Sequence, residues 1–178
     1  MEERDYFKQF DIHFGNLSVG QHCSDLEISN TFFEKHSNED IIGANIHVRL
    51  EVERKEALVI LSFNLRGTLY SICDLCLEKL SIPVANDEKL ILKIVPHPYE
   101  SDDESLVFIS ENTYSYNVEQ TLFEYLYALI PIRKVHGEIG FETCNQEMLA
   151  LIENAKTRPI LQEDARWEVL KSIKLEDN

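Results

Sequence analysis

The residues best suited to chemistry in this sequence are cysteines. Cys73 and Cys76 lie three positions apart at the end of a predicted strand, a spacing that can turn both sulfur atoms toward one point and supply half of a tetrahedral zinc site. His136 and Cys144, eight residues apart and just past a predicted helix, offer the other two ligands. The four residues would form a structural Cys₃His zinc site. This site would close the long loop from Cys76 to His136. Closing a long loop restricts the unfolded chain strongly, so the metal would stabilise the fold.

Two other interpretations of these cysteines stay open. Thiols often lie in a core as small apolar groups that hold no ligand. A redox pair at Cys73 and Cys76 would need an exposed first cysteine at a helix N-terminus in a βαβ unit, whereas the pattern before it is an antiparallel hairpin. Cys23 lies in a weaker strand and is predicted to be an ordinary core residue. The five histidines other than His136 have no neighbours at ligand spacing.

Alternating apolar and polar residues predict the strands that must position these ligands. Residues 46–53 and 59–66 alternate with the period of two that is typical of a half-buried strand. The short polar turn between them indicates an antiparallel hairpin. The second run continues past Gly67, a predicted bulge or bend, to Cys73. Further strands are predicted over residues 10–14, 22–28, 90–95 and 106–109.

Capping residues and apolar spacing predict the helices. The strongest helix covers residues 117–130: Asn117 can cap it, Gln120 lies where a capping box requires it, and Pro131 ends it. A short helical turn with an asparagine cap is predicted at residues 30–36. Two more helices are predicted over residues 145–154 and 164–173.

These elements predict an α+β fold, with an antiparallel β-sheet or partly closed barrel and helices mainly in the C-terminal half. We expect a single α+β domain over residues 1–154. Residues 155–178 are predicted to form a C-terminal tail with a short terminal helix.

The composition is that of a folded but strongly acidic protein. Of the 178 residues, 44% are hydrophobic and 28% charged, which excludes a disordered or collagen-like chain. The net charge of −15 repels phosphate backbones and suits a basic partner. No stretch has the apolar length of a membrane span or the pattern of a signal peptide. We therefore expect a cytoplasmic protein without membrane association, whose thiols stay reduced.

Charge is unevenly distributed in the second half of the chain. Residues 94–132 hold seven acidic side chains and no lysine or arginine, whereas residues 156–174 hold five basic and three acidic ones. Both can be simply solvated surface. The acidic segment can also bind a basic protein. Any nucleic-acid or partner contact by basic or stacking residues would come from Arg133, Lys134, Arg158, Arg166, Trp167 and Lys171. Trp167 can equally well pack the terminal helix onto the domain.

The sequence lacks the usual signatures of enzymes. It contains no glycine-rich phosphate loop, no Gly-x-Ser-x-Gly elbow and no His-Glu-x-x-His motif. The acidic cluster at residues 102–104 lies in a polar stretch that is typical of a loop rather than of a Mg²⁺ site. We expect no enzymatic activity.

The order of motifs along nearly the whole chain is similar to that of a known family. A glycine and a strand lead into the cysteine pair (residues 67–78), followed by Pro83. An acidic segment then precedes a helix that ends in Leu129-Ile130-Pro131, and His136 follows. This combination resembles the YceD family. The chain's end resembles its Bacteroidetes-type branch, in Glu142-x-Cys144-Asn145 and in Asp164-Ala165-Arg166-Trp167 with Leu170-Lys171.

The resemblance implies a role in ribosome biogenesis. This family is catalogued as a domain of unknown function and is also called the large ribosomal RNA subunit accumulation protein family. Its members are implicated in the accumulation of 23S rRNA. Their genes often lie beside one for a small basic ribosomal protein. We therefore expect a YceD-like domain with no small-molecule substrate, and a basic ribosomal protein, a 23S rRNA precursor or both as partners. The alternatives are a thiol redox protein that uses Cys73 and Cys76, and a plain protein-interaction module.

Overall fold

The computed structural model describes residues 3–36, 40–140 and 142–156. Contacts divide the chain into two compact units, Met1–Cys144 and Asn145–Asn178, which are described separately here. The predicted α+β fold class is confirmed: strands dominate the first unit, and the two longest helices, α3 (Glu119–Ala128) and α4 (Gln146–Lys156), come late in the chain. The domain boundary expected after residue 154 stays a prediction.

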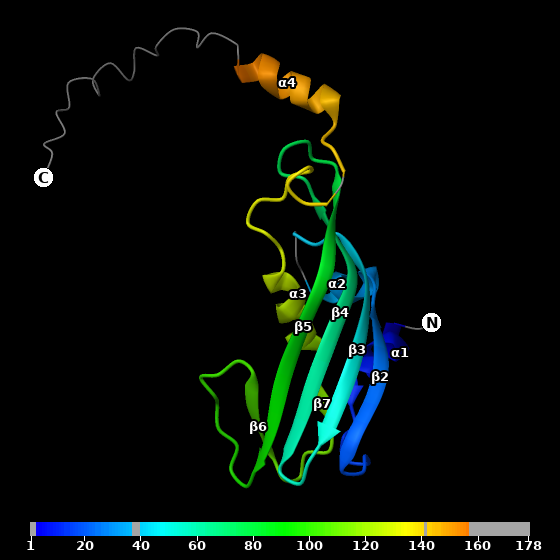
Figure 1. Cartoon of the computed structure of the whole chain (residues 1–178), viewed down its shortest axis with the longest axis vertical. Helices are drawn as coiled ribbons and strands as arrows, with labels where there is room; N and C mark the ends of the chain where they lie inside the picture. Colours follow the sequence, from blue (N-terminus) through cyan, green and yellow to red (C-terminus); the bar gives the residue numbers. More distant parts are fainter. Residues whose placement is uncertain (1–2, 37–39, 141, 157–178) are drawn as a thin grey trace, which may run out of the picture. The chain divides into compact units, whose positions relative to one another are not determined.

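The first unit is built on a five-stranded sheet with the order β2-β3-β4-β5-β6 (Figure 1). Its strands are β2 (Gly20–Ile28), β3 (Gly43–Arg54), β4 (Leu58–Ile72), β5 (Lys79–Val95) and β6 (Leu106–Ser110). Neighbours pair antiparallel, except that β6 runs parallel to β5. The sheet is open, with β2 and β6 at its edges, and the described strands do not close into a barrel.

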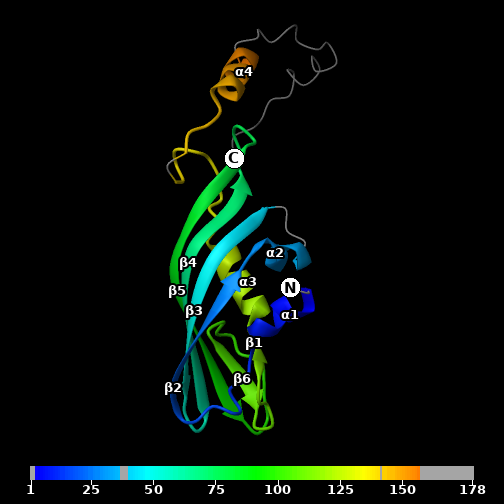
Figure 2. The same cartoon turned by 90° about the vertical axis from the view of Figure 1, so that its right-hand side faces the viewer.

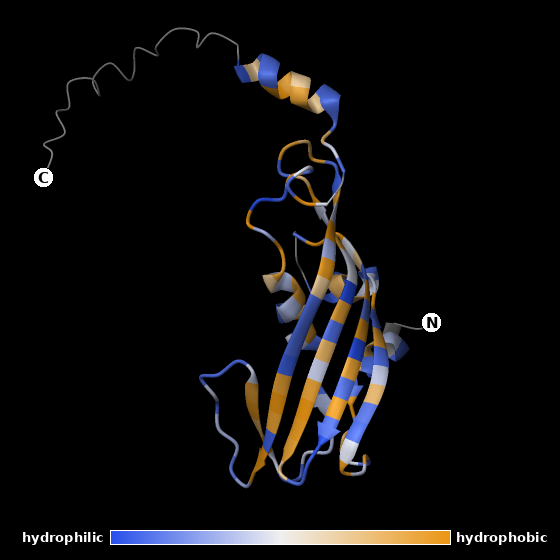
Figure 3. Ribbon diagram, viewed as in Figure 1, coloured by the Kyte–Doolittle hydropathy of each residue, from blue (hydrophilic) through white to orange (hydrophobic). Residues whose placement is uncertain are grey.

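The predicted hairpin of β3 and β4 forms the centre of the core. Leu50 lies opposite Phe63 and Val52 opposite Leu61, and all four side chains are buried. The alternation is visible as bands of apolar and polar residues along the strands (Figure 3). A slip of one residue would turn every one of these apolar side chains to solvent, so the pattern fixes the register.

Helices cover one side of this sheet: α1 (Glu3–Phe7), α2 (Asn30–Lys35) and α3 (Figure 2). Leu122 and Leu126 of α3 are fully buried. The ring of Tyr125 meets Phe63 of β4 edge-on, with 5.9 Å between the ring centroids. The helices thus bury the apolar face of the sheet and leave its polar face to solvent.

The start of α2 differs from the prediction. Ser29, not Asn30, occupies the N-cap position. The side chain of Asn30 is used elsewhere: its Oδ1 accepts a hydrogen bond of 2.9 Å from the backbone N–H of Ala44 in β3. Asn30 therefore joins the helix to the sheet instead of capping it.

The start of α3 also differs, because a second, two-stranded sheet precedes it. β1 (Asp11–Ile12) pairs with β7 (Tyr116–Asn117), so Asn117 ends a strand. Its Oδ1 accepts a 2.9 Å hydrogen bond from the backbone N–H of Glu119. The predicted capping box is wrong, since the side chain of Gln120 donates to Glu124 four residues on instead.

The largest difference from the prediction is the length of β5. The sequence predicts only residues 90–95 as a strand, because residues 86–89 are all polar. In the structure β5 pairs with the whole of β4, from Lys79 opposite Ile72 to Lys93 opposite Leu58. This long hairpin carries its tip, residues 73–78, to one end of the sheet.

Gly67 allows the strands of this hairpin to approach closely. It keeps the regular register opposite Ile46 and Val84, so the bulge, one of the two predicted alternatives, is absent. Its φ of +151° is one that residues with side chains rarely adopt. A Cβ atom at this position would collide with the backbone of Asn45 and Ile46.

The described part of the second unit is α4. The Oδ1 of Asn145 accepts hydrogen bonds from the backbone N–H groups of Glu147 and Met148, at 2.9 and 3.3 Å. This is the N-cap arrangement expected for the predicted helix at residues 145–154. The helix predicted over residues 164–173 lies outside the described residues.

Candidate metal centre

The tip of the β4–β5 hairpin positions the first pair of ligands. The backbone N–H of Cys73 donates to the carbonyl of Glu78 (2.8 Å), and that of Leu77 donates to the carbonyl of Cys73 (3.0 Å). Leu77 has a φ of 61°, and this left-handed conformation reverses the chain directly after Cys76. The side chains of Cys73 and Cys76 are buried in this turn.

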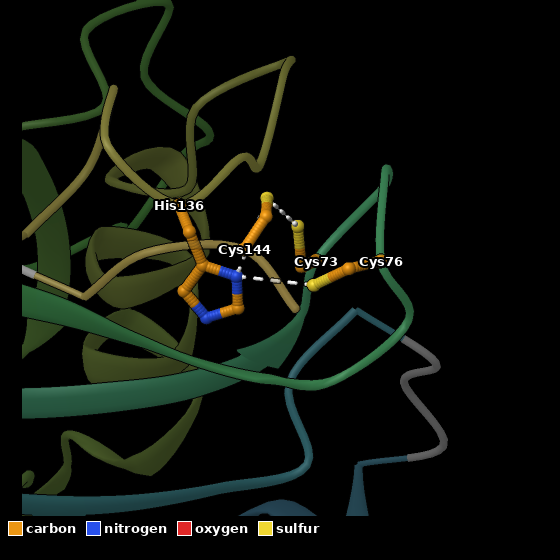
Figure 4. A group of neighbouring side chains, drawn as sticks. All are labelled: Cys73, Cys76, His136 and Cys144. Atoms are coloured by element: carbon orange, nitrogen blue, oxygen red, sulfur yellow. Dashed lines mark hydrogen bonds between the residues drawn. The ribbon is translucent and has the colours of Figure 1, made fainter. Parts of the chain in front are cut away.

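The segment after α3 brings the second pair to the tip. The backbone N–H of Asp74 donates to the carbonyl of Lys134 (2.7 Å), and the backbone N–H of Lys134 donates to the Asp74 carboxylate (2.6 Å). This two-way contact fastens the chain two residues before His136. His136 and Cys144 then point toward the two hairpin cysteines (Figure 4).

The four potential ligand atoms lie close together. Sγ of Cys73 is 3.8 Å from Sγ of Cys144, and Nδ1 of His136 is 3.3 Å from Sγ of Cys76 and 3.8 Å from Sγ of Cys144. All four atoms lie within 4.8 Å of one another. A tetrahedral zinc ion bound at about 2.3 Å from sulfur and about 2.0–2.1 Å from nitrogen separates its ligand atoms by about 3.5–3.8 Å. The cluster therefore fits a tetrahedral metal ion.

The separation of the sulfur atoms excludes a disulfide in this state. The 3.8 Å between Sγ of Cys73 and Sγ of Cys144 is far longer than the S–S bond of about 2.05 Å, and all four cysteines are free thiols. All four side chains of the cluster are buried. A buried group of three thiols and an imidazole is a typical ligand set for a metal ion, which would neutralise the thiolates that bind it.

His136 has the orientation that a metal ligand needs. Its Nε2 lies 3.0 Å from the carbonyl oxygen of Lys79, to which the Nε2–H group donates. The proton at Nε2 leaves Nδ1, the atom that faces the sulfurs, with a lone pair for a metal. The Glu142 carboxylate lies 3.5 Å from the same Nε2 and accepts a 3.0 Å hydrogen bond from the Ser81 hydroxyl. These outer contacts fix the ring.

The electrostatics of the cluster favour one thiolate. Burial opposes ionisation of Cys73, but the backbone N–H groups of Cys76, His136 and Leu75 outweigh it and bring the pKa of Cys73 to about 6. Backbone N–H groups aimed at a sulfur stabilise its negative charge.

The other members of the cluster respond to that charge. Burial and the neighbouring thiols of Cys73 and Cys76 raise the pKa of Cys144 to about 11. Burial alone would lower the pKa of His136, but its contacts with the Lys79 carbonyl and the Cys76 sulfur raise it. A second thiolate is therefore suppressed unless a cation neutralises the first, as a divalent metal would.

An ion pair supports the segment that carries His136. Nζ of Lys134 hydrogen-bonds to the Asp40 carboxylate, which also accepts a 3.1 Å bond from the Tyr127 hydroxyl of α3. The Lys134 bond, and then the Tyr127 bond, lower the pKa of Asp40; the bond to Asp40 raises the pKa of Lys134. The Lys134 side chain is only 14% exposed.

The predicted contact residues occupy different environments. Arg133 is largely exposed and pairs with Glu138 at 2.8 Å, whereas the ammonium group of Lys134 is occupied by Asp40. The remaining four of these residues lie outside the described part of the chain: Arg158, Arg166, Trp167 and Lys171. Their roles stay predictions.

Sequence reasoning missed the residues that hold the ligands in place. Asp74, Glu142 and Ser81 act through hydrogen bonds between segments far apart in the chain. Asp74 lies between the two hairpin cysteines, and Glu142 belongs to the Glu142-x-Cys144-Asn145 motif, but neither position indicated a supporting contact. Ser81 has no such sequence signal.

The prediction for Cys23 is wrong. The residue is exposed on β2, opposite Glu51, because the buried Leu26 and Ile28 assign the even-numbered residues of this strand to the core face.

The comparisons with known proteins add no assignment. No family model, no curated protein and no solved structure matches this chain. The resemblance to the YceD family therefore stays a prediction from the motifs. Within residues 3–36, 40–140 and 142–156, no helix has the length and apolar character needed to cross a membrane.

Proposed function

We propose that this protein is a non-enzymatic, cytoplasmic ribosome-biogenesis factor that supports 23S rRNA synthesis, processing or accumulation and contains a structural zinc ion. The convergence of Cys73, Cys76, His136 and Cys144 at the hairpin tip carries the zinc part of this proposal. The ribosomal part is supported by the YceD-like motif order, which includes all four residues of this cluster.

A structural role for the zinc follows from the ligand set. Three cysteines and one histidine complete a tetrahedron, which leaves no position for a catalytic water or a substrate. Soft thiolate ligands favour zinc over calcium or magnesium, which prefer oxygen. The metal would join the hairpin tip to a segment 60 residues further on, from Cys76 to His136, and so restrict a long loop.

The charge of the protein favours a basic protein as its direct partner. At −15, the chain repels RNA over most of its surface and attracts a basic ribosomal protein, whose charge it would shield. Direct contact with a 23S rRNA precursor would have to come from a local basic group such as Arg133. The Arg133→Glu variant should then bind this RNA more weakly and with a flatter salt dependence. Unchanged affinity and salt slope would remove Arg133 from the interface.

Zinc content tests the metal site. We expect about one zinc ion per purified chain, and a loss of zinc in both Cys76→Ser and His136→Ala. Cys23→Ser is the matched control, because this exposed cysteine lies outside the cluster. Loss of zinc in the control as well, or retention in both ligand variants, would contradict the assignment.

Depletion of the protein in cells tests the ribosomal role. We expect the amount of 23S rRNA to fall relative to 16S rRNA and to recover with the wild-type chain. A normal ratio in depleted cells would reject this role and leave a plain interaction module.

The cluster supports thiol redox chemistry as a second candidate function, because the pKa of Cys73 is lowered to about 6 in the metal-free chain. A reactive thiolate must also be accessible, and Cys73 is fully buried. Fast labelling of Cys73 by a thiol reagent in zinc-loaded protein would favour this candidate. Labelling only after zinc removal would favour the structural role.

A further inference from the structure

A hollow of about 560 Å³ lies beside β6, near the end of β5 that is remote from the cysteines. Its lining combines apolar and acidic side chains. The apolar ones are Pro98, Tyr99, Leu106, Val107 and Phe108, and the acidic ones are Glu100, Asp103 and Glu104. This mixture suits a long side chain with an apolar stem and a positive head.

A second hollow of about 590 Å³ shares Asp103 and Glu104 with the first. It adds the carboxylates of Glu88 and Asp102. Two lysines of β5 lie near the hollows: Lys89 lines the second hollow, and Nζ of Lys93 lies 5.7 Å from the ring centroid of Phe108. Residues 94–132 supply no lysine or arginine, so negative charge is in clear excess.

The aromatic residues of the first hollow are arranged to receive a cation. Tyr99 stacks on Phe108 with 4.0 Å between ring centroids and 25° between ring planes, yet Tyr99 is 63% exposed. An exposed aromatic ring attracts a lysine or arginine head group. Lys93 shows that the stacked pair already accepts one cation from the chain itself.

We propose that these adjoining hollows bind successive Lys and Arg side chains of a basic segment in a protein partner. Charge complementarity decides the occupant: carboxylates repel the phosphates of a nucleic acid and attract ammonium and guanidinium groups. The inference rests on the proposed role as a partner of a basic ribosomal protein and assigns the surface that makes the contact.

Binding of an oligoarginine peptide tests this surface, with the matching oligocitrulline peptide as the uncharged probe. The Glu100→Lys/Glu104→Lys variant should weaken oligoarginine binding about tenfold, since two favourable charges become repulsive. Glu27→Lys/Glu34→Lys is the matched control: it makes the same change in net charge at exposed glutamates elsewhere in the same unit, and less than about a twofold change is expected. Tyr99→Ala should weaken binding by a further factor of about three.

Three results would overturn the proposal: equal losses in the two double variants, undiminished binding by the Glu100/Glu104 variant, or equal binding of the citrulline peptide. Thermal unfolding of each variant verifies that it is folded.

Depletion in cells, combined with peptide binding by the variant, separates this proposal from the proposed function. If depletion lowers the 23S to 16S ratio and the Glu100/Glu104 variant binds peptide normally, the surface is rejected and the ribosomal role stands. If depletion leaves the ratio normal while the variant loses peptide binding, the surface stands and the ribosomal role is rejected.

Discussion

β5 begins at Lys79, after a turn that contacts a segment distant in the sequence. It ends at Val95, before a loop whose side-chain hydrogen bonds join residues close in the sequence. The turn at residues 73–78 meets a segment about 60 residues later through His136 and Lys134. The loop at residues 96–105 contains hydrogen bonds between residues two apart, such as those from Ser105 to Asp103, and is joined to β5 by a backbone bond from Ile91 to the Ser105 carbonyl. One strand thus begins at the candidate metal site and ends at the acidic surface proposed to bind a partner.

The difference matches the two roles proposed for the ends of β5. Long-range closure by buried ligands restricts the unfolded chain strongly and favours a single rigid arrangement. Short-range hydrogen bonds between exposed groups cost little to rearrange, which suits a surface that must adapt to a partner. Changes at the two ends of β5 should therefore have very different effects.

Metal removal should have the largest effect and should act on one end only. Treatment with a chelator should lower the free energy of unfolding by at least about 3 kcal/mol, because binding energy at a structural zinc site contributes to folding. Amide hydrogen exchange should accelerate at Cys73 and Leu77. It should stay slow at Ile109 of β6, which serves as the control. Equal acceleration at both ends would contradict the comparison.

Between the two ends of the β4–β5 hairpin, substitution of Gly67 should destabilise the fold. Gly67→Ala should lower the free energy of unfolding by about 2–3 kcal/mol, because the new Cβ atom meets the backbone of β3. Gly20→Ala is a matched control: its φ of +137° is also unfavourable, but no atom lies within 4 Å of the new Cβ. Chemical denaturation measures both variants, and an equal loss would show that strain alone, not close approach, determines the cost.

A smaller effect is expected for the outer contacts of the cysteine cluster. Glu142→Gln removes the negative charge beside Nε2 of His136 and should reduce zinc affinity about tenfold, in the range typical of such outer contacts. Glu138→Gln is the control, since this residue pairs with Arg133 on the surface. Competition with a zinc-binding dye measures both affinities. An unchanged affinity for Glu142→Gln would show that the Lys79 carbonyl is sufficient to orient the ring.

The smallest effect concerns the opposite end of β5 and depends on pH. The Ser105 hydroxyl, and then the Ser105 backbone N–H, lower the pKa of Asp103 from its ordinary value of 3.8. A carboxylate whose pKa is lowered by folding stabilises the fold above its ordinary pKa, and the contribution is lost as pH falls through the lowered value. The Ser105 amide signal in an NMR titration should therefore change with a midpoint below pH 3.8. It should show no such transition in Asp103→Asn, and a midpoint above 3.8 would contradict the account.

The sequence was informative wherever one short-range pattern decides the structure. Alternation predicted β3 and β4 because one face of each strand is buried. Residues 79–84 of β5 follow the same rule, with Leu80, Ile82 and Val84 buried, but were not predicted as a strand. Residues 85–89 have no apolar alternation, and their strand structure depends on pairing with β4. Asn30 was assigned as a helix cap, but its side chain accepts a hydrogen bond from Ala44 of β3 instead. The Asn117 side chain does accept a hydrogen bond at the start of α3, from the backbone N–H of Glu119.

The cluster was predictable for a related reason. Few residues in the chain can be soft metal ligands, so the choice of ligands is small. The Cys73–Cys76 pair can be recognised from its spacing alone, without knowledge of the rest of the fold. The contacts of Asp74, Glu142 and Lys134 require the segment after α3 to lie against the hairpin tip, which no local pattern indicates. The hollow beside β6 likewise depends on how residues 98–104 fold over the strand.

X-ray absorption at the zinc edge of the purified protein tests the central claim most directly. The account predicts one zinc ion with three sulfur ligands at about 2.3 Å and one nitrogen ligand at about 2.0–2.1 Å. The His136→Ala variant, if it retains any zinc, should lose the nitrogen ligand, and the Cys23→Ser control should keep the full set. A spectrum dominated by oxygen ligands, or protein that folds stably without zinc, would contradict the assignment of Cys73, Cys76, His136 and Cys144 as a structural metal site.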